Sequence, residues 1–196
     1  KGTLIREVLR TVPQIGYSVS FTTRKIREGE EDGKHYNFVS REEFENLIKL
    51  GEFLEFAEVH GNYYGTSKKQ VERETSFGRD IILEIDVQGA NSIREKMPEA
   101  VGIFILPPSY EVLRERLIAR KTESAEDLAV RLKNSGDEVK EYVKFDYVIV
   151  NDEVAKATLD LQSVIYAHRC KHERQDETVE RILDTFNNFK TNSIGD

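Results

Sequence analysis

The sequence predicts an α/β protein in which helices flank a core of parallel strands and a smaller mixed α/β lobe is inserted. Residues 80–85 and 100–106 are nearly continuous apolar runs, as expected for buried strands, and residues 147–150 read as a third strand. Helical segments follow these runs, and strands that alternate with helices form a parallel sheet. Short strand-like pieces and turn signals cluster within residues 17–66, which indicates the inserted lobe.

Composition limits the class of protein and its partners. The chain has 196 residues, of which 38% are hydrophobic and 33% charged, as expected for one globular domain with mobile lobes. The net charge of −7 argues against nonspecific binding to nucleic acid. No apolar run approaches the roughly 18 residues that span a bilayer, so no membrane partner is expected. The single cysteine, Cys170, excludes an internal disulfide and fits a reducing, cytoplasmic location.

The first residues carry a possible phosphate-binding signal. Lys1, Gly2 and Thr3 precede a segment whose apolar residues, from Leu4 to Val12, follow helical spacing. A lysine at the first turn of a helix is typical of the end of a phosphate-binding loop. The glycines that come before such a lysine are not in the sequence. The simpler alternative is a helix with a lysine near its start, and the motif alone would favour it.

The lobe contains helix and hairpin signals. Ser40 and Glu43 form a capping box that starts a helix. Residues 52–60 and 63–66 follow as the strands of a hairpin. Ser67 then starts the next helix. These short elements differ in pattern from the longer apolar strands of the core.

A pair of arginines in the lobe suggests a bound anion. A short strand with alternating apolar residues, Tyr17, Val19 and Phe21, leads into a polar loop that carries Arg24 and Arg27. Guanidinium groups beside hydroxyl donors suit a phosphate. Hydroxyls flank the arginines on Ser20, Thr22, Thr23 and Tyr36. For two arginines alone, a solvated basic loop is about equally good as an interpretation.

Two further regions point to ligand binding. Asp86, Pro107 and Asn151 follow the three predicted core strands, and ligands of parallel sheets bind beyond the carboxyl ends of strands. Residues 113–132 place several arginines in two helical segments joined by a polar tip, a pattern that fits a mobile lid. The alternative for this region is a pair of surface helices with i,i+4 ion pairs, and several of the arginines are expected to do only that.

The motifs together resemble those of guanylate kinases. The resemblance extends from Lys1 to about Arg174, and each piece is weak alone although the combination is specific. The matching segments are SVSFTTR (18–24), GEFLEFAEVHGNYYGT (51–66), LEIDVQGA (83–90), RLIARKTES (116–124) and VIVND (148–152).

The resemblance implies an enzyme that moves the γ-phosphoryl group of ATP to GMP, or dGMP, with Mg²⁺, giving ADP and GDP. It also implies a P-loop kinase core, a GMP-binding lobe and a helical lid. The core would comprise residues 1–16, 67–112 and 133–196, the lobe residues 17–66, and the lid residues 113–132.

Site residues follow from the same resemblance. Those that hold the GMP phosphate would be Arg24, Arg27, Tyr36 and Tyr64, and those that surround the guanine Ser20, Glu55, Thr66 and Asp86. The ATP site would contain Lys1, Gly2, Thr3, Arg120, Asn151 and Asp152. Catalytic roles would fall to Lys1, Arg24, Arg120 and Arg131. Gly2 stands where many such loops carry Ser or Thr for the metal, so Mg²⁺ would depend on Thr3 or, through water, on Asp86.

Two other functions remain open from the sequence. A catalytically silent guanylate-kinase-like domain could bind phosphorylated protein partners through the GMP pocket, but it would have little use for Lys1 and the lid arginines. A related P-loop kinase could act on another nucleotide or sugar phosphate, but the Glu55 and Asp86 carboxylates favour guanine. The oligomeric state, monomer or homo-oligomer, is left open.

Overall fold

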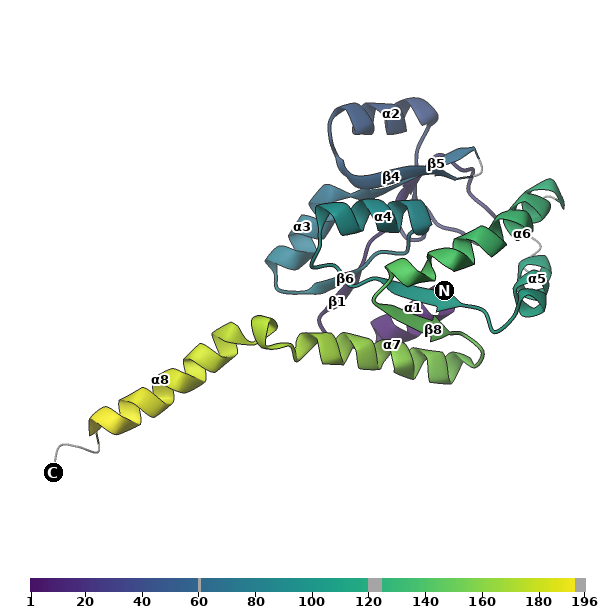
Figure 1. Cartoon of the computed structure of the whole chain (residues 1–196). Helices are drawn as coiled ribbons and strands as arrows, with labels where there is room; N and C mark the ends of the chain where they lie inside the picture. The colour runs from purple at the N-terminus through teal and green to yellow at the C-terminus, as the bar shows by residue number, and fades with distance from the viewer. Residues whose placement is uncertain (60, 120–124, 193–196) are drawn as a thin grey trace.

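The computed structural model describes residues 1–59, 61–119 and 125–192. The strands of the core form two parallel ladders. β1 (Ile15–Tyr17) pairs with β6 (Asp80–Ile82), and β7 (Ile103–Leu106) pairs with β8 (Tyr147–Val150). Both pairs are parallel, and helices connect the strands along the chain (Figure 1). The predicted α/β core is therefore confirmed, with its strands in two separate pairs.

The core strands are shorter and more exposed than the sequence predicts. The run 80–85 is a strand only over Asp80–Ile82, because its partner β1 has just three residues. The run 100–106 is a strand only over Ile103–Leu106. The prediction that these strands are buried was wrong, because β6 and β7 are half-buried along their length. Each strand pairs along only one edge in the described part of the chain, so less of its surface is covered.

Helices pack against these strands and form the main core. Buried side chains of α1 (Gly2–Thr11) and of α7 (Val154–Arg169) meet Ile149 of β8. The apolar spacing predicted for the first helix thus produces its buried face. The core residues are Leu4, Val8, Val12, Ile149, Ala157 and Leu161. The other helices of this part are α3 (Lys68–Ser76), α4 (Val87–Lys96), α5 (Tyr110–Ala119), α6 (Ala125–Lys140) and the short η1 (Glu141–Lys144).

The lobe is a four-stranded sheet with the order β3-β2-β5-β4. Its strands are β2 (Phe21–Thr22), β3 (Asn37–Phe38), β4 (Phe53–Val59) and β5 (Asn62–Ser67). The predicted hairpin is confirmed as the antiparallel pair β4–β5. The predicted capping box is also confirmed, since Ser40 and Glu43 cap α2 (Arg41–Lys49). The fully buried Phe44 of α2 stacks on Phe53 and Tyr63, with ring centroids at 4.5 and 5.2 Å, and so attaches α2 to the sheet.

The strand predicted through residues 17–21 is instead two strands in different sheets. β1 ends at Tyr17 in the core, and β2 begins at Phe21 in the lobe. Gln70 on α3 binds the chain where it crosses between them. Its Nε2 donates to the Tyr17 carbonyl at 3.1 Å, and its Oε1 accepts from the Val19 amide at 3.1 Å. The alternating apolar residues therefore lie along two strands of different sheets and the crossing between them, which the pattern alone does not reveal.

The end of α7 and the short η2 that follows it both bind the carboxylate of Asp80. Asp80 accepts from Arg169 Nε and from an Arg174 terminal nitrogen, each at 2.7 Å. Burial alone would raise the pKa of Asp80, but these two bonds outweigh it and lower the pKa. Arg174 ends the short η2 (His172–Arg174), and α8 (Asp176–Asn192) then projects away from the rest of the chain (Figure 1).

α8 has an apolar row that the described chain leaves exposed. The exposed fractions of these side chains lie between 47% and 61%, and their spacing puts them along one side of the helix. They are Val179, Ile182, Leu183 and Phe186.

None of the described helices combines the length and the apolar character that a membrane span requires.

Candidate active site

β5 of the lobe organises the site residues. Tyr64 and Thr66 are two residues apart on this strand, so their side chains project from the same face. Thr22 of β2 lies opposite Tyr64 in the ladder, and Glu55 of β4 lies opposite Thr66. The other face of β5 carries Tyr63 and packs on α2. One face of the sheet thus forms the lobe's core, and the other displays polar groups.

Cationic and phenolic groups gather at the Tyr64 end. The ring of Tyr36 meets that of Tyr64 edge to face, with centroids 5.9 Å apart, and the Arg24 guanidinium lies 5.4 Å from the Tyr36 centroid. Both terminal nitrogens of Arg24 donate to the carboxylate of Glu30, at 2.8 and 3.0 Å. The backbone amide of Arg27 also donates to Glu30, at 2.8 Å. Glu30 therefore orders the whole loop that carries the two arginines.

Electrostatics favour a strongly cationic Arg24. Its side chain is 12% exposed, and burial by itself would lower its pKa. The bonds to Glu30 outweigh this effect and raise the pKa of Arg24. For Tyr36, burial and then the negative charge of Glu84 raise the pKa of the phenol, so Tyr36 keeps its proton and can donate it in a hydrogen bond.

Acceptor groups gather at the Thr66 end. Glu55 is 3% exposed, and its Oε1 accepts from the Thr66 hydroxyl at 2.5 Å. Asp86 is the N-cap of α4 and accepts from the Gly89 amide at 2.8 Å. Burial raises the pKa of Glu55, and the Asp86 charge adds to this, although the Thr66 hydrogen bond opposes it. Two carboxyl groups thus lie close together in a place with little water.

A second group of residues surrounds the start of α1. Lys1 is the N-cap of α1, and its Nζ lies 3.4 Å from the carbonyl of Ile85, three residues after the end of β6. The carboxylate of Glu84 accepts from the Tyr17 hydroxyl at 3.4 Å, and a Cβ on Gly2 would lie 3.9 Å from it. Burial and then Glu84 raise the pKa of Tyr17. The first helix therefore begins beside a carboxylate at the carboxyl end of a core strand, as the sequence predicts for ligand-binding loops.

A side chain of α5 binds the turn that follows β8. Arg116 of α5 donates to the carbonyls of Asn151 and Asp152, at 2.7 and 3.2 Å. The amide oxygen of Asn151 is buried and has no hydrogen-bond partner in the described part of the chain. An unpaired buried acceptor is unfavourable unless a ligand or water supplies a donor.

The remaining predicted residues are placed as follows. Ser20 is buried and lies beside β2, two residues before Thr22. Thr3 is exposed on the first turn of α1. Arg131 lies on α6. Arg120 lies outside the described residues. The role predicted for each of these stays a prediction.

Sequence reasoning missed several residues that order the site. Glu84 could have been found from the sequence, because a charged residue inside the apolar run 80–85 is unusual in a buried strand and can indicate a functional role. Glu30, Gln70 and Arg116 had none, because each reaches a partner that the fold alone brings near.

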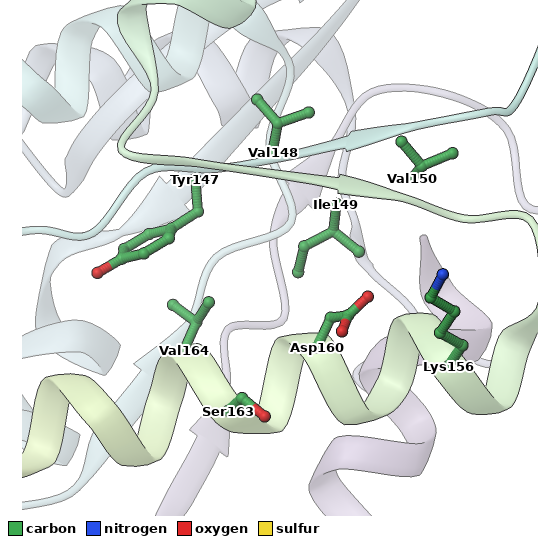
Figure 2. A pocket seen from close by; sticks show the side chains of 8 residues that line it. All are labelled: Tyr147, Val148, Ile149, Val150, Lys156, Asp160, Ser163 and Val164. Atoms are coloured by element: carbon green, nitrogen blue, oxygen red, sulfur yellow. The ribbon is translucent and has the colours of Figure 1, made fainter.

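A shallow groove elsewhere is separate from these residues. It lies between β8 and α7, where Tyr147 and Ile149 point toward the helix while Val148 and Val150 point away (Figure 2). Lys156 and Asp160 of α7 line it, and none of the predicted site residues does. The groove therefore adds nothing to the candidate site.

An α/β core of parallel strands, with an inserted lobe that separates a cationic end from an acidic end, is typical of enzymes that transfer phosphoryl groups to small molecules. Comparison with known proteins narrows this class. A family model described as guanylate kinase matches residues 1–168. The chain belongs to the guanylate kinase family, which confirms the resemblance seen in the sequence.

Individual relatives agree with the family model. The chain is 48% identical to a guanylate kinase of Symbiobacterium thermophilum over 94% of this chain and 88% of that protein. It is 51% identical to a guanylate kinase of Neisseria meningitidis over 94% of this chain and 90% of the relative. A crystal structure of guanylate kinase from Anaplasma phagocytophilum has a TM-score of 0.77 and 39% identity, and covers 88% of this chain and 84% of that one.

Proposed function

We propose that this protein transfers the γ-phosphoryl group of ATP to GMP and releases ADP and GDP. The observation that carries the proposal is the arrangement along β5, with an arginine–tyrosine cluster at Tyr64 and a carboxylate pair at Thr66. A nucleoside monophosphate has the matching arrangement, with an anionic phosphate at one end and a base with donor groups at the other. Family membership supports the same reaction.

The phosphate of GMP is proposed to bind between Arg24, Arg27, Tyr36 and Tyr64. Arg24 and Tyr36 already contact one another, and Tyr64 lies against Tyr36. Each charge-assisted hydrogen bond to the phosphate contributes about 1.5–3 kcal/mol. Four such groups suffice to anchor the acceptor phosphate for in-line attack.

Guanine is proposed to lie against Ser20, Glu55, Thr66 and Asp86. Its N1–H and exocyclic amine are both donors on one edge, and an ionised carboxylate is an acceptor only. Adenine has an acceptor at N1, which ionised Glu55 would repel. Discrimination by unmet hydrogen bonds can reach about 10⁴-fold.

ATP is proposed to bind on the core side of the site. Lys1, Gly2 and Thr3 lie at the N-terminal end of α1, where backbone amides and the helix dipole favour phosphate. Asn151 and Asp152 are assigned to the adenine, and the unpaired Asn151 amide oxygen supports this role. Arg131 and Arg120 are assigned to the transferring group. Phosphoryl transfer depends on positioning and charge neutralisation, so these side chains need no covalent step.

The division into core, lobe and lid is part of the proposal. Residues 17–66 would hold GMP, and residues 113–132 would close over the phosphates. Closure excludes water from the transferring group, which suppresses ATP hydrolysis. The cytoplasm is the proposed location of this reaction.

Mg²⁺ is proposed to accompany ATP. It usually binds one or two carboxylates, with water and phosphate oxygens completing its shell. Glu84 fits this requirement, because its carboxylate lies beside Gly2 at the start of α1. Asp86 is the other candidate, since each of the two carboxylates has one oxygen that already accepts a hydrogen bond, from the Gly89 amide in Asp86 and from the Tyr17 hydroxyl in Glu84. Thr3 and Asp86 stay predictions as ligands. When bound, the ion would neutralise charge on the phosphates.

A catalytically silent domain is not favoured. The relatives that match 94% of the chain at 48–51% identity are guanylate kinases. Lys1 and Arg131, which a binding module would not need, are both present in the sequence.

A coupled assay of ADP release tests the proposal. We expect rapid turnover with GMP and at least about 10³-fold lower kcat/KM with AMP, because adenine leaves the carboxylates unpaired. Glu55→Gln should lower the preference for GMP, because the amide can donate to adenine N1. Glu58→Gln, an exposed glutamate on the same strand, is the matched control and should keep the preference. Equal rates with GMP and AMP in the unmodified protein would contradict the assignment of Glu55.

A further inference from the structure

Gly89 occupies a helical position where another residue would be expected. It is the third residue of α4, it is buried, and its backbone does not need the positive φ that favours glycine. Glycine is less favourable than alanine in a helix. Local conformation therefore does not account for a glycine here.

The missing side chain leaves room for Glu55. A Cβ on Gly89 would lie 2.7 Å from Glu55 Oε2 and 3.2 Å from its Cδ. It would also lie 3.3 Å from an oxygen of Asp86. The first of these separations is shorter than carbon and oxygen atoms tolerate, so a side chain at this position would have to displace the Glu55 carboxylate.

Glu55 has little freedom to move elsewhere. It is 3% exposed, its other oxygen accepts from the fully buried Thr66, and its strand is paired on β5. Lys96, at the end of α4, donates to the carbonyl of Leu54 at 2.6 Å and fixes the helix against this strand. Because both partners are held, the contact between Gly89 and Glu55 sets the position of the carboxylate.

We propose that Gly89 is a specificity-determining positioning residue. Its bare backbone admits the Glu55 carboxylate to the first turn of α4, beside Asp86. There the two carboxylate acceptors lie side by side at the N-terminal end of the helix. This inference rests on the proposed function, because it assumes that the two carboxylates accept hydrogen bonds from the N1–H and the exocyclic amine of guanine.

Gly89→Ala is the direct test. We expect the KM for GMP to rise at least tenfold and the preference for GMP over AMP to fall at least tenfold. The KM for ATP should change less than twofold. The melting temperature should fall, because the new side chain meets a buried carboxylate that is held in place. A purely structural role would instead reduce the rates with GMP and AMP equally and leave the preference for GMP unchanged.

Gly136→Ala is the matched control. Gly136 lies in α6, also without a positive φ, and no atom lies within 4 Å of the place where its Cβ would be. The same change there should keep both the KM for GMP and the preference for GMP. If Gly89→Ala behaves like Gly136→Ala, the inference is overturned.

A double variant covers the case in which Gly89→Ala does not fold. In a Glu55→Ala background the clash is absent. Adding Gly89→Ala there should not lower the melting temperature, and it should not change the remaining ratio of GMP to AMP rates. A further loss in the double variant would show that Gly89 acts elsewhere and would refute the inference. Failure of the unmodified protein to phosphorylate GMP would instead refute the proposed function, so the two failures are distinguishable.

Discussion

Glu55, which is proposed to bind guanine, is a carboxyl group whose charge is disfavoured by its surroundings. Burial raises its pKa above the ordinary value of 4.5. The raised pKa means that the ionised form destabilises the folded protein above the folded-state pKa, and that this effect disappears below pH 4.5. The proposed role of Glu55 in selecting guanine would thus cost some stability.

The pKa of Glu55 predicts a pH dependence of binding. The KM for GMP should begin to rise while the pH is still above 4.5, because protonated Glu55 no longer accepts two hydrogen bonds. The KM for ATP should not follow the same curve. Steady-state kinetics between about pH 5 and 8 measure this, and Glu55→Gln should abolish the GMP-specific rise. A rise that survives in Glu55→Gln would assign the titration to another group.

At the residue scale, the sequence was most informative where function uses a residue type directly. Arg24, Tyr36 and Tyr64 were predicted together, and the structure brings them into contact. Glu30 was not predicted, because its pairing with Arg24 depends on the path of a loop that has no periodic pattern. Supporting contacts of this kind become visible only in three dimensions.

Among the elements, α3 connects the core and the lobe. Gln70, in its first turn, bonds to the backbone on both sides of the crossing at Ser18, and the Ser18 hydroxyl lies 3.4 Å from its Oε1. Ser67, which ends β5 and caps α3, marks the place where the chain leaves the lobe. One amide side chain therefore links the chain's entry to the lobe with its exit.

Gln70→Ala should loosen this link. It leaves a carbonyl and an amide of the crossing without their partner, which destabilises the fold by about 1–3 kcal/mol. The KM for GMP should rise more than the KM for ATP, because the lobe's position is affected most. Thermal melting and steady-state kinetics provide the measurements. Glu72→Ala on the exposed side of the same helix is the control, and an equal effect there would contradict the role of Gln70.

At the element scale, local signals predicted what depends on neighbouring residues. The capping box at Ser40, the hairpin and the Ser67 cap all follow from short-range chemistry, and all three are confirmed. The division of residues 17–21 between two sheets was missed, because tertiary pairing decides it. The lengths of the core strands were overestimated for the same reason, since a strand ends where its partner ends.

The whole molecule consists of a compact catalytic part and the projecting helix α8. The family model ends at residue 168, before α8 begins at Asp176. Between them, Arg169 and Arg174 hold Asp80 of β6. The chain therefore has a boundary near residue 175, after the last contact with Asp80.

Two truncations locate this boundary. Removal of residues 176–196 should change kcat and both KM values less than about twofold, because α8 projects away from the rest of the chain (Figure 1). Removal from residue 169 onward should also lower the melting temperature, because Asp80 then loses both arginines and a buried charge is left unpaired. Kinetics and thermal melting distinguish the two. A tenfold loss of kcat in the shorter truncation would contradict this division.

The pair between Arg24 and Glu30 has a consequence for how the pocket selects its ligands. Both terminal nitrogens of the guanidinium donate to the Glu30 carboxylate. A small anion such as chloride would only replace this carboxylate, which the chain itself holds in place. The proposed ligand GMP would add contacts of its base and sugar to those of its phosphate. We therefore expect inorganic anions to compete weakly with GMP for Arg24.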